Sequence, residues 1–117
     1  MTTALEQDST NEVILFIHAA VAIEIAEYLP EFLPAAHRDL THLRNLIDTT
    51  DTVRMFFLEL LWAKHYYREA KFTHERTTLY QSRTALERAK GYGCTAYHRQ
   101  EIDWWEERTQ QALHSTH

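Results

Sequence analysis

The scarcity of glycine and proline is the feature that most limits what this chain can fold into. Only two glycines and two prolines occur in 117 residues. Glycine supplies the turns that need a positive φ angle, and an all-β fold needs many short turns of that kind. Hydrophobic residues make up 44% of the chain and charged residues 25%, as in an ordinary globular domain. We therefore expect an all-α fold of long helices.

The spacing of apolar residues predicts five helices joined by short breaks. We expect them at about residues 11–28, 34–48, 52–72, 74–91 and 95–113. Thr50 or Asp51 is suited to cap the third helix, Thr73 to cap the fourth, and Gly91 to end it. The predicted fold is a compact bundle of four to five antiparallel helices. It forms one domain over residues 11–113, with frayed ends at residues 1–10 and 114–117.

One part of the chain resembles a tetratricopeptide hairpin. The pairs Tyr66-Tyr67, Tyr80-Gln81 and Ala85-Leu86 follow the YY…YQ…AL rhythm of that family. The resemblance covers about thirty residues, and no second copy of the family's period of about 34 residues follows. It implies a single TPR-like helical hairpin made by the third and fourth helices, and no repeat array.

The cysteine count and the apolar runs bear on the cellular location of the protein. Cys94 is the only cysteine, so neither an internal disulfide nor a multi-cysteine metal site can form. The apolar run at residues 13–17 lacks the basic start of a signal peptide. His18 and Glu24 interrupt the stretch that follows, well short of the roughly twenty apolar residues of a membrane span. We expect a cytoplasmic protein without a membrane partner.

Charge is distributed unevenly along the chain. Residues 1–37 contain six acidic residues and no Lys or Arg, whereas basic residues concentrate between Lys64 and Lys90. The net charge is −5, which makes the whole chain a poor generic binder of nucleic acid. From its net charge, nucleic acid is therefore not expected as a partner of the chain. The basic stretch could still bind a single phosphate group.

A histidine–glutamate pair lies in the polar stretch at residues 61–80. His65 and Glu69 are four residues apart, so one helix places both on the same face. Such a pair is half of a common iron or zinc site. At about 100° per residue, however, both lie opposite the apolar stripe that contains Phe56 and Tyr67. We interpret the pair as part of a solvated, ion-paired face, with a metal site at His65 and Glu69 as the alternative.

Arg68 and His74 have an Arg-x5-His spacing that resembles the motif of HEPN-type ribonucleases. Those enzymes are all-helical and of similar size, and as dimers they bring two such pairs together to cut RNA. The resemblance implies Arg68 and His74 as catalytic candidates. Here Glu69 follows the arginine, and its carboxylate would repel phosphate. A lone spacing also occurs by chance in many helical proteins, so the RNase is an alternative and not the main interpretation.

His18 lies on the apolar side of the first helix, opposite Glu24 and Glu27. A buried histidine must be neutral and hydrogen-bonded, or paired with an acid. We therefore expect His18 to be a buried polar residue, with a ligand or switch role as the alternative. Burial would make the fold lose stability as the pH falls through about 6.

The first helix is apolar around most of its circumference. It is expected either to be central in the bundle or to meet another chain with half of its surface. Trp104 and Trp105 are adjacent, so they point about 100° apart and cannot both lie in one narrow buried stripe. We expect these two tryptophans and Phe16 to be interface residues, because aromatic side chains at the edge of a stripe often anchor interfaces.

Together these features predict a small helical protein–protein interaction module, of the adaptor or regulatory kind. It is expected to self-associate, as a homodimer, and to bind a further protein that the sequence does not identify. No cofactor is implied, and the molecule is more easily explained without an enzymatic activity. The alternatives are the HEPN-like RNase and a metal-binding bundle with histidine and carboxylate ligands.

Overall fold

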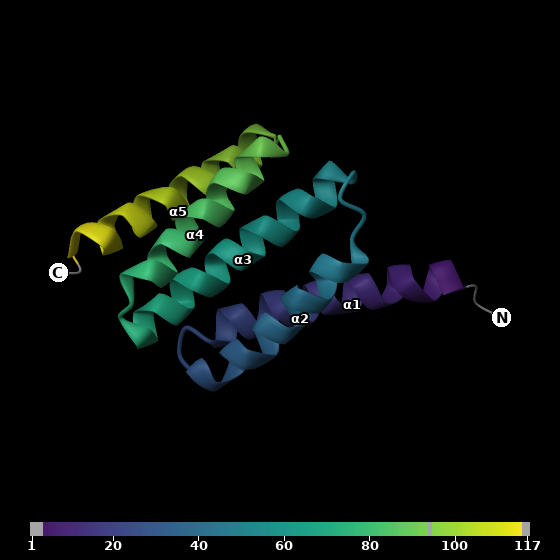
Figure 1. Cartoon of the computed structure of the whole chain (residues 1–117), viewed down its shortest axis with the longest axis horizontal. Coiled ribbons are helices and arrows are strands. Elements are labelled where there is room, and N and C mark those ends of the chain that lie inside the picture. The colour runs from purple at the N-terminus through teal and green to yellow at the C-terminus, as the bar shows by residue number, and fades with distance from the viewer. Residues whose placement is uncertain (1–3, 94, 116–117) are drawn as a thin grey trace.

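The computed structural model of this chain describes residues 4–93 and 95–115, and its side chains from Asn11 onward. All secondary-structure elements in those ranges are helical, which confirms the all-α prediction. They are α1 (Ala4–Ile25), the 3-10 helix η1 (Pro30–Phe32), α2 (Leu33–Leu46), α3 (Thr52–Thr73), α4 (Arg76–Gly91) and α5 (Ala96–Ser115) (Figure 1). Cys94 lies outside the described residues.

The helices form an elongated bundle with α3 in the middle. α1 and α2 make an antiparallel pair on one side of α3, and α4 and α5 lie on its other side (Figure 1). The bundle measures 56 × 32 × 21 Å along its principal axes. α3 packs against each of the four other α-helices, and α3 and α4 form the helical hairpin that the tyrosine pattern implies.

α3 is buried on most of its circumference because neighbours surround it. Its buried residues are Met55, Phe56, Leu58, Glu59, Leu60, Trp62, Ala63, His65, Arg68 and Ala70. The prediction of a single buried stripe on this helix, with a solvated face opposite, is therefore wrong. The central helix of the bundle is α3 and not α1, because α1 packs with one face only and leaves apolar side chains of its other face exposed.

The ends of several helices follow the local signals in the sequence. The carboxylate of Asp51 accepts a hydrogen bond from the Arg54 backbone N–H at 3.1 Å, which caps α3. α4 ends at Gly91, and Gly93 has a positive φ of 78°. Thr95 accepts from the backbone N–H of His98 and starts α5. The Asp51 cap, the end of α4 at Gly91 and a fifth helix that starts near residue 95 were all predicted, and all three are confirmed.

Other boundaries differ from the predicted ones. α1 begins at Ala4 instead of near residue 11. α4 begins at Arg76 and has no side-chain cap, and Thr73 is the last residue of α3. α5 continues to Ser115, into the segment that was expected to be frayed.

The core is made by side chains from all five α-helices. α2 contributes a stripe of apolar residues that recur with the helical period, Leu33, Ala36, Leu40 and Leu43, and Ile47 just after its end is buried as well. α1 adds Ile23 and the small residues Ala19 and Ala22, which let it approach α2 closely, and Ala26 is buried just after the helix ends. None of the described helices combines the length and the apolar character needed to cross a membrane.

Candidate functional site

The outward face of α1 carries a row of exposed aliphatic side chains. Val13, Ile14, Ile17 and Val21 are each 44% to 57% exposed, and we call them the α1 ridge. They lie on the face opposite the alanines that pack on the bundle. Adjacent apolar residues left in water are unusual on a monomer and commonly mark a binding surface.

An apolar groove of about 510 Å³ runs beside the ridge, between α1 and α3. Phe16, Phe57 and Leu61 line it, together with Val13 and Ile17 of the ridge. Its lining is mostly apolar, so a partner that fills it would gain mainly from the burial of hydrophobic surface. Phe16, an expected interface residue, lies half-buried in this groove.

The charged residues at the rim of this groove are paired within the chain. Arg54 contacts Glu12 at 3.0 Å, and Lys64 contacts Glu101 of α5 at 2.7 Å. These ion pairs connect α1 to α3 and α3 to α5. The rim therefore offers an incoming molecule little unpaired charge, and recognition here has to be apolar.

The tryptophans of α5 do not line this groove. Trp105 is buried, and its ring packs against Tyr67 with 5.4 Å between centroids, so the prediction that Trp105 lies at an interface is wrong. Trp105 is a core residue because its position on α5 faces α3. Trp104 is 46% exposed, but it lines a different pocket.

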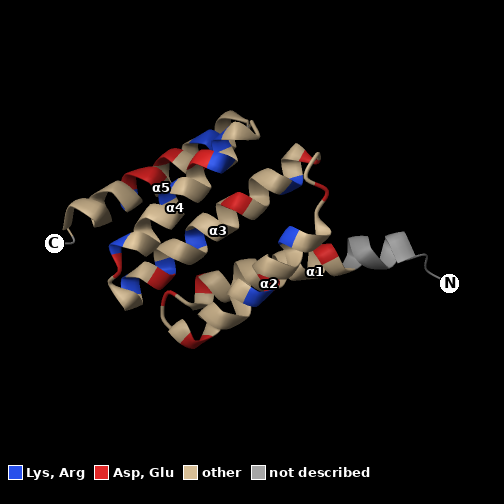
Figure 2. Ribbon diagram, in the orientation of Figure 1, with Lys and Arg blue, Asp and Glu red and all other residues tan. Residues whose placement is uncertain are grey.

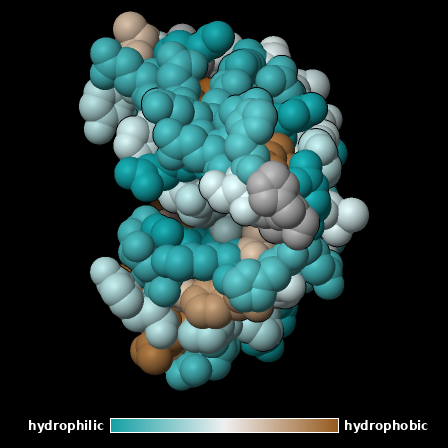
Figure 3. Space-filling view, turned by 90° about the vertical axis from the view of Figure 1, so that its left-hand side faces the viewer, coloured by the Kyte–Doolittle hydropathy of each residue, from teal (hydrophilic) through white to brown (hydrophobic). Residues whose placement is uncertain are grey.

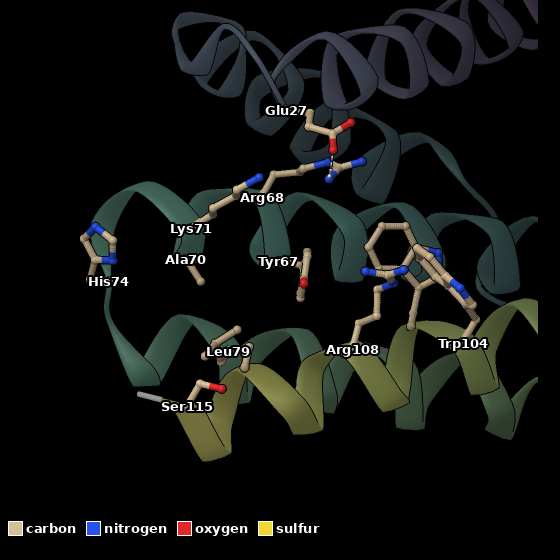
Figure 4. A pocket seen from close by; sticks show the side chains of 12 residues that line it. Glu27, Tyr67, Arg68, Ala70, Lys71, His74, Leu79, Trp104, Arg108 and Ser115 are labelled. Carbon is tan, nitrogen blue, oxygen red and sulfur yellow. Dashed lines mark ion pairs between the residues drawn. The ribbon is translucent and has the colours of Figure 1, made fainter. Parts of the chain in front are cut away.

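That second cavity, which we call the α3–α5 pocket, has a volume of about 620 Å³. Its walls come from the C-terminal half of α3, from α5, from the start of α4 and from the turn after α1. It lies towards the left-hand end of the bundle in Figure 1, where the surface is largely hydrophilic and hollowed (Figure 3). Figure 4 shows Tyr67 pointing into the space between α3 and α5.

Cationic side chains dominate the charged lining of the α3–α5 pocket. Arg68, Lys71 and Arg108 line it, and the only carboxylate among the described lining residues is that of Glu27, in the turn after α1. The Arg68 guanidinium lies 3.6 Å from the Glu27 carboxylate, which is a long ion pair (Figure 4). Arg108 lies over the ring of Trp104, with its guanidinium carbon 4.0 Å from the ring centroid, a cation–π contact.

The two RNase candidates, Arg68 and His74, both line this pocket. Arg68 is buried and held by Glu27, whereas His74 is exposed at the end of α3. His74 has a left-handed backbone with φ 60°, and its N–H donates to the carbonyl of Ala70 at 2.8 Å. Within the described residues no hydrogen bond joins the two side chains. The family motif requires two such pairs from two chains, so catalysis by these residues stays a prediction.

His65 is 1% exposed, so the prediction that it lies on a solvated face is wrong. α2 covers it: the Nε2 atom of His65 lies 3.4 Å from Nδ1 of His37, and the ring of Trp62 packs against both. Burial, and in second place the neighbouring His37, lower the pKa of His65 to about 4. His65 is therefore neutral at pH 7.

For the alternative of a metal site, the structure brings together His65 and Glu69 but no third ligand among the described residues. The Glu69 carboxylate lies 4.0 Å from the Nε2 atom of His65 and is partly solvated. Nowhere in the described part of the chain do three or more histidine, cysteine, aspartate or glutamate side chains come together as metal ligands. Two ligands are fewer than the three or four that a zinc site uses.

His18 is exposed, and the prediction that it is buried is wrong. The prediction took the side of the first helix with Glu24 and Glu27 as the solvent side. In the structure Glu24 is exposed, but Glu27 and also Glu12 turn towards the bundle, where Glu12 pairs with Arg54 and Glu27 with Arg68. The opposite side, with His18 and the α1 ridge, faces outward.

A buried carboxylate on α3 could not be anticipated from its own helix. Glu59 is 1% exposed, and Arg44 of α2 and Arg88 of α4 approach it at 3.2 Å and 3.4 Å. Both arginines keep part of their surface in solvent. These ion pairs connect α3 to α2 and α4, and we interpret them as part of the packing of the bundle and not as a binding site.

The α1 ridge with its groove and the α3–α5 pocket are thus the two surfaces of the described chain with distinctive chemistry. The first is apolar, and the charges on its rim are paired. The second is cationic and aromatic. Comparisons with protein-family models, with curated proteins and with solved structures find no match to this chain, so its function has to be inferred from these two surfaces.

Proposed function

We propose that this protein is a small protein–protein interaction module that self-associates through the α1 ridge. The observation that carries the proposal is the contiguous exposure of the four ridge residues, each at least 44% exposed. A single exposed aliphatic residue is ordinary, but a row of them next to an apolar groove is a liability unless another surface covers it.

The ridge is arranged so that a second copy can cover it symmetrically. Val13, Ile17 and Val21 are spaced by four residues and form one straight row along α1. If two α1 helices meet antiparallel about a two-fold axis at Ile17, Val13 of each copy faces Val21 of the other. Such i±4 rows pack into one another at a crossing angle of about −50°. The surface is self-complementary, as a two-fold interface requires.

Electrostatics are expected to contribute little to this association. The acidic α1 segment was expected to meet the basic Lys64–Lys90 stretch of a second copy. Instead, Glu27 pairs with Arg68 of its own chain, and the rim charges of the groove are also paired internally. Basic and acidic residues are interspersed along the helices (Figure 2). We therefore propose that apolar burial drives dimerisation and that added salt weakens it only slightly.

Association through α1 is compatible with an adaptor role. α4 and α5 lie on the far side of α3 from α1 and α2 (Figure 1). Both would stay accessible in the dimer, and a further protein could bind there. A dimer of this kind presents two copies of each remaining surface, which raises the avidity for a partner that has two binding sites.

The test is the solution mass at micromolar concentration, measured by light scattering after size-exclusion chromatography. The wild-type chain is expected at twice its mass of 13.9 kDa. Ile17→Asp should be monomeric, because it places two carboxylates at the proposed two-fold axis in an apolar interface. The matched control is Leu29→Asp, which changes an aliphatic residue of similar exposure, 45%, outside the ridge and should stay dimeric.

Both variants change exposed residues, so each should keep the helical circular dichroism of the wild-type chain. A wild-type protein that is monomeric throughout the micromolar range overturns the proposal. Dimers that persist in Ile17→Asp but dissociate in Leu29→Asp would place the interface elsewhere.

A further inference from the structure

The α3–α5 pocket has positive charge that the described chain does not neutralise. Lys71 and Arg108 form no ion pair with any residue in the described ranges. The one carboxylate among the described lining residues, that of Glu27, is already paired with Arg68. In a hollow with low-dielectric walls, such a cationic lining attracts an anion more strongly than the same charges do on a flat surface.

Arg68 is the residue best placed to receive that anion. It is 9% exposed, and its Nε atom is buried without any hydrogen-bond partner. A buried donor left unpaired costs about 1 to 3 kcal/mol. Its ion pair with Glu27 is long, at 3.6 Å, so the guanidinium loses little by turning towards an anion in the pocket. A planar guanidinium binds phosphate oxygens with two parallel hydrogen bonds.

The rest of the pocket suits a flat ring. Trp104 is 46% exposed and already has the guanidinium of Arg108 against its ring, 4.0 Å from the centroid. Tyr67 contributes a second aromatic wall (Figure 4). Aromatic side chains next to cationic ones bind bases by stacking, with little dependence on sequence. The volume of about 620 Å³ exceeds what a bare phosphate fills and lies within the usual range for small organic ligands.

We propose that the α3–α5 pocket binds a nucleoside phosphate, with its phosphate on Arg68 and Lys71 and its base against Trp104. A free mononucleotide and the phosphorylated end of a single RNA strand share this chemistry. The site is separate from the proposed dimer surface, because no residue of the α1 ridge or its groove lines the pocket. Failure of dimerisation and failure of nucleotide binding are therefore distinguishable.

The test is isothermal titration calorimetry of the full chain with adenosine 5′-monophosphate, adenosine, inorganic phosphate and a 5′-phosphorylated single-stranded RNA tetramer. We expect adenosine monophosphate to bind with a stoichiometry of one per chain. Adenosine and inorganic phosphate should each bind at least about tenfold more weakly, because each lacks one half of the recognised ligand. Tighter binding of the tetramer than of the mononucleotide would identify the strand end as the natural ligand, and the reverse would identify the free nucleotide.

Variants separate the pocket from general surface charge. Lys71→Gln and Arg108→Gln change exposed residues and should leave the fold intact while lowering the affinity for adenosine monophosphate about tenfold each. Arg68→Gln should have a larger effect, with circular dichroism to confirm that it folds. The matched control is Arg83→Gln, an exposed arginine of α4 outside the pocket, which should bind like wild type. Undetectable binding of both nucleotide probes, or equal binding of adenosine and its phosphate, overturns the proposal. So does an affinity that Lys71→Gln and Arg108→Gln leave unchanged.

Discussion

Acidification is expected to destabilise the fold through one buried side chain, His65. The imidazole is 1% exposed, and it is enclosed by His37, Trp62 and Tyr66. Burial and His37 lower the pKa of His65 from 6.5 to about 4. The Glu69 carboxylate, 4.0 Å away and partly solvated, is too distant to compensate for the loss of hydration.

The sign and the size follow from linkage between protonation and folding. Below pH 6.5 the unfolded chain binds a proton at His65, but the folded chain does not until the pH nears 4. The free energy of unfolding therefore falls as the pH falls through this window. One pKa unit corresponds to about 1.4 kcal/mol, so the total loss is about 3 kcal/mol, of which about 2 kcal/mol appears between pH 7 and pH 5. A domain of this size has only about 5–15 kcal/mol of stability.

The assay is urea unfolding, followed by far-ultraviolet circular dichroism, at several values between pH 7 and pH 5. Most carboxylates stay ionised in this range, which isolates the histidines. His65→Gln should flatten the pH dependence, whatever it does to the stability at pH 7. His18→Gln is the control, because His18 is exposed and was the residue that the sequence indicated. An equally steep loss of stability in His65→Gln and in wild type would refute this reasoning.

Three further predictions concern stability and use the same urea assay. Glu59→Gln should cost about 2 kcal/mol, because it removes the buried charge that two arginines share, whereas the exposed Glu87→Gln should stay within about 0.5 kcal/mol of wild type. Ser82→Ala should cost about 1 kcal/mol, since its buried hydroxyl donates a 2.8 Å hydrogen bond to a backbone carbonyl of α3. Asp51→Ala should cost about 1 kcal/mol through loss of the α3 cap.

The features that the sequence predicts correctly are local ones. Asp51 caps α3, and Gly91 ends α4, through contacts with residues only a few positions away. The buried stripe of α2 is equally readable, because this helix packs with one face and its apolar residues recur with the helical period. Such signals fix the number of helices and most of their ends.

The features that escape prediction depend on which helices become neighbours. An angular plot assumes that a helix has one buried stripe, but α3 is packed from several sides. His65 and Arg68 are polar residues that become buried because other parts of the chain lie beside them, His37 of α2 and Glu27 of the turn after α1. These partners are remote in sequence, so no spacing within residues 61–80 could indicate them.

The sequence indicates each of the two candidate surfaces only in part. The apolar excess of the first helix is evident in the sequence, yet which half of it faces outward is decided by the inward ion pairs of Glu12 and Glu27. Trp104 and Trp105 are adjacent, and only their packing separates an exposed ring from a core ring. The α3–α5 pocket combines residues of α3, α4 and α5 with Glu27 of the turn after α1, and it has no sequence motif.

The most direct test of the central claim, that a second copy covers the α1 ridge, is site-specific cross-linking. In a Cys94→Ser background, Ile17→Cys places one thiol per chain at the proposed two-fold axis, where the thiols of two copies meet. Under mild oxidation at micromolar concentration we expect this variant to form a disulfide-linked dimer rapidly. Leu29→Cys, a control of similar exposure outside the ridge, should stay largely uncrosslinked. Equal cross-linking rates for the two variants, or no cross-linking at Ile17→Cys, would contradict the account.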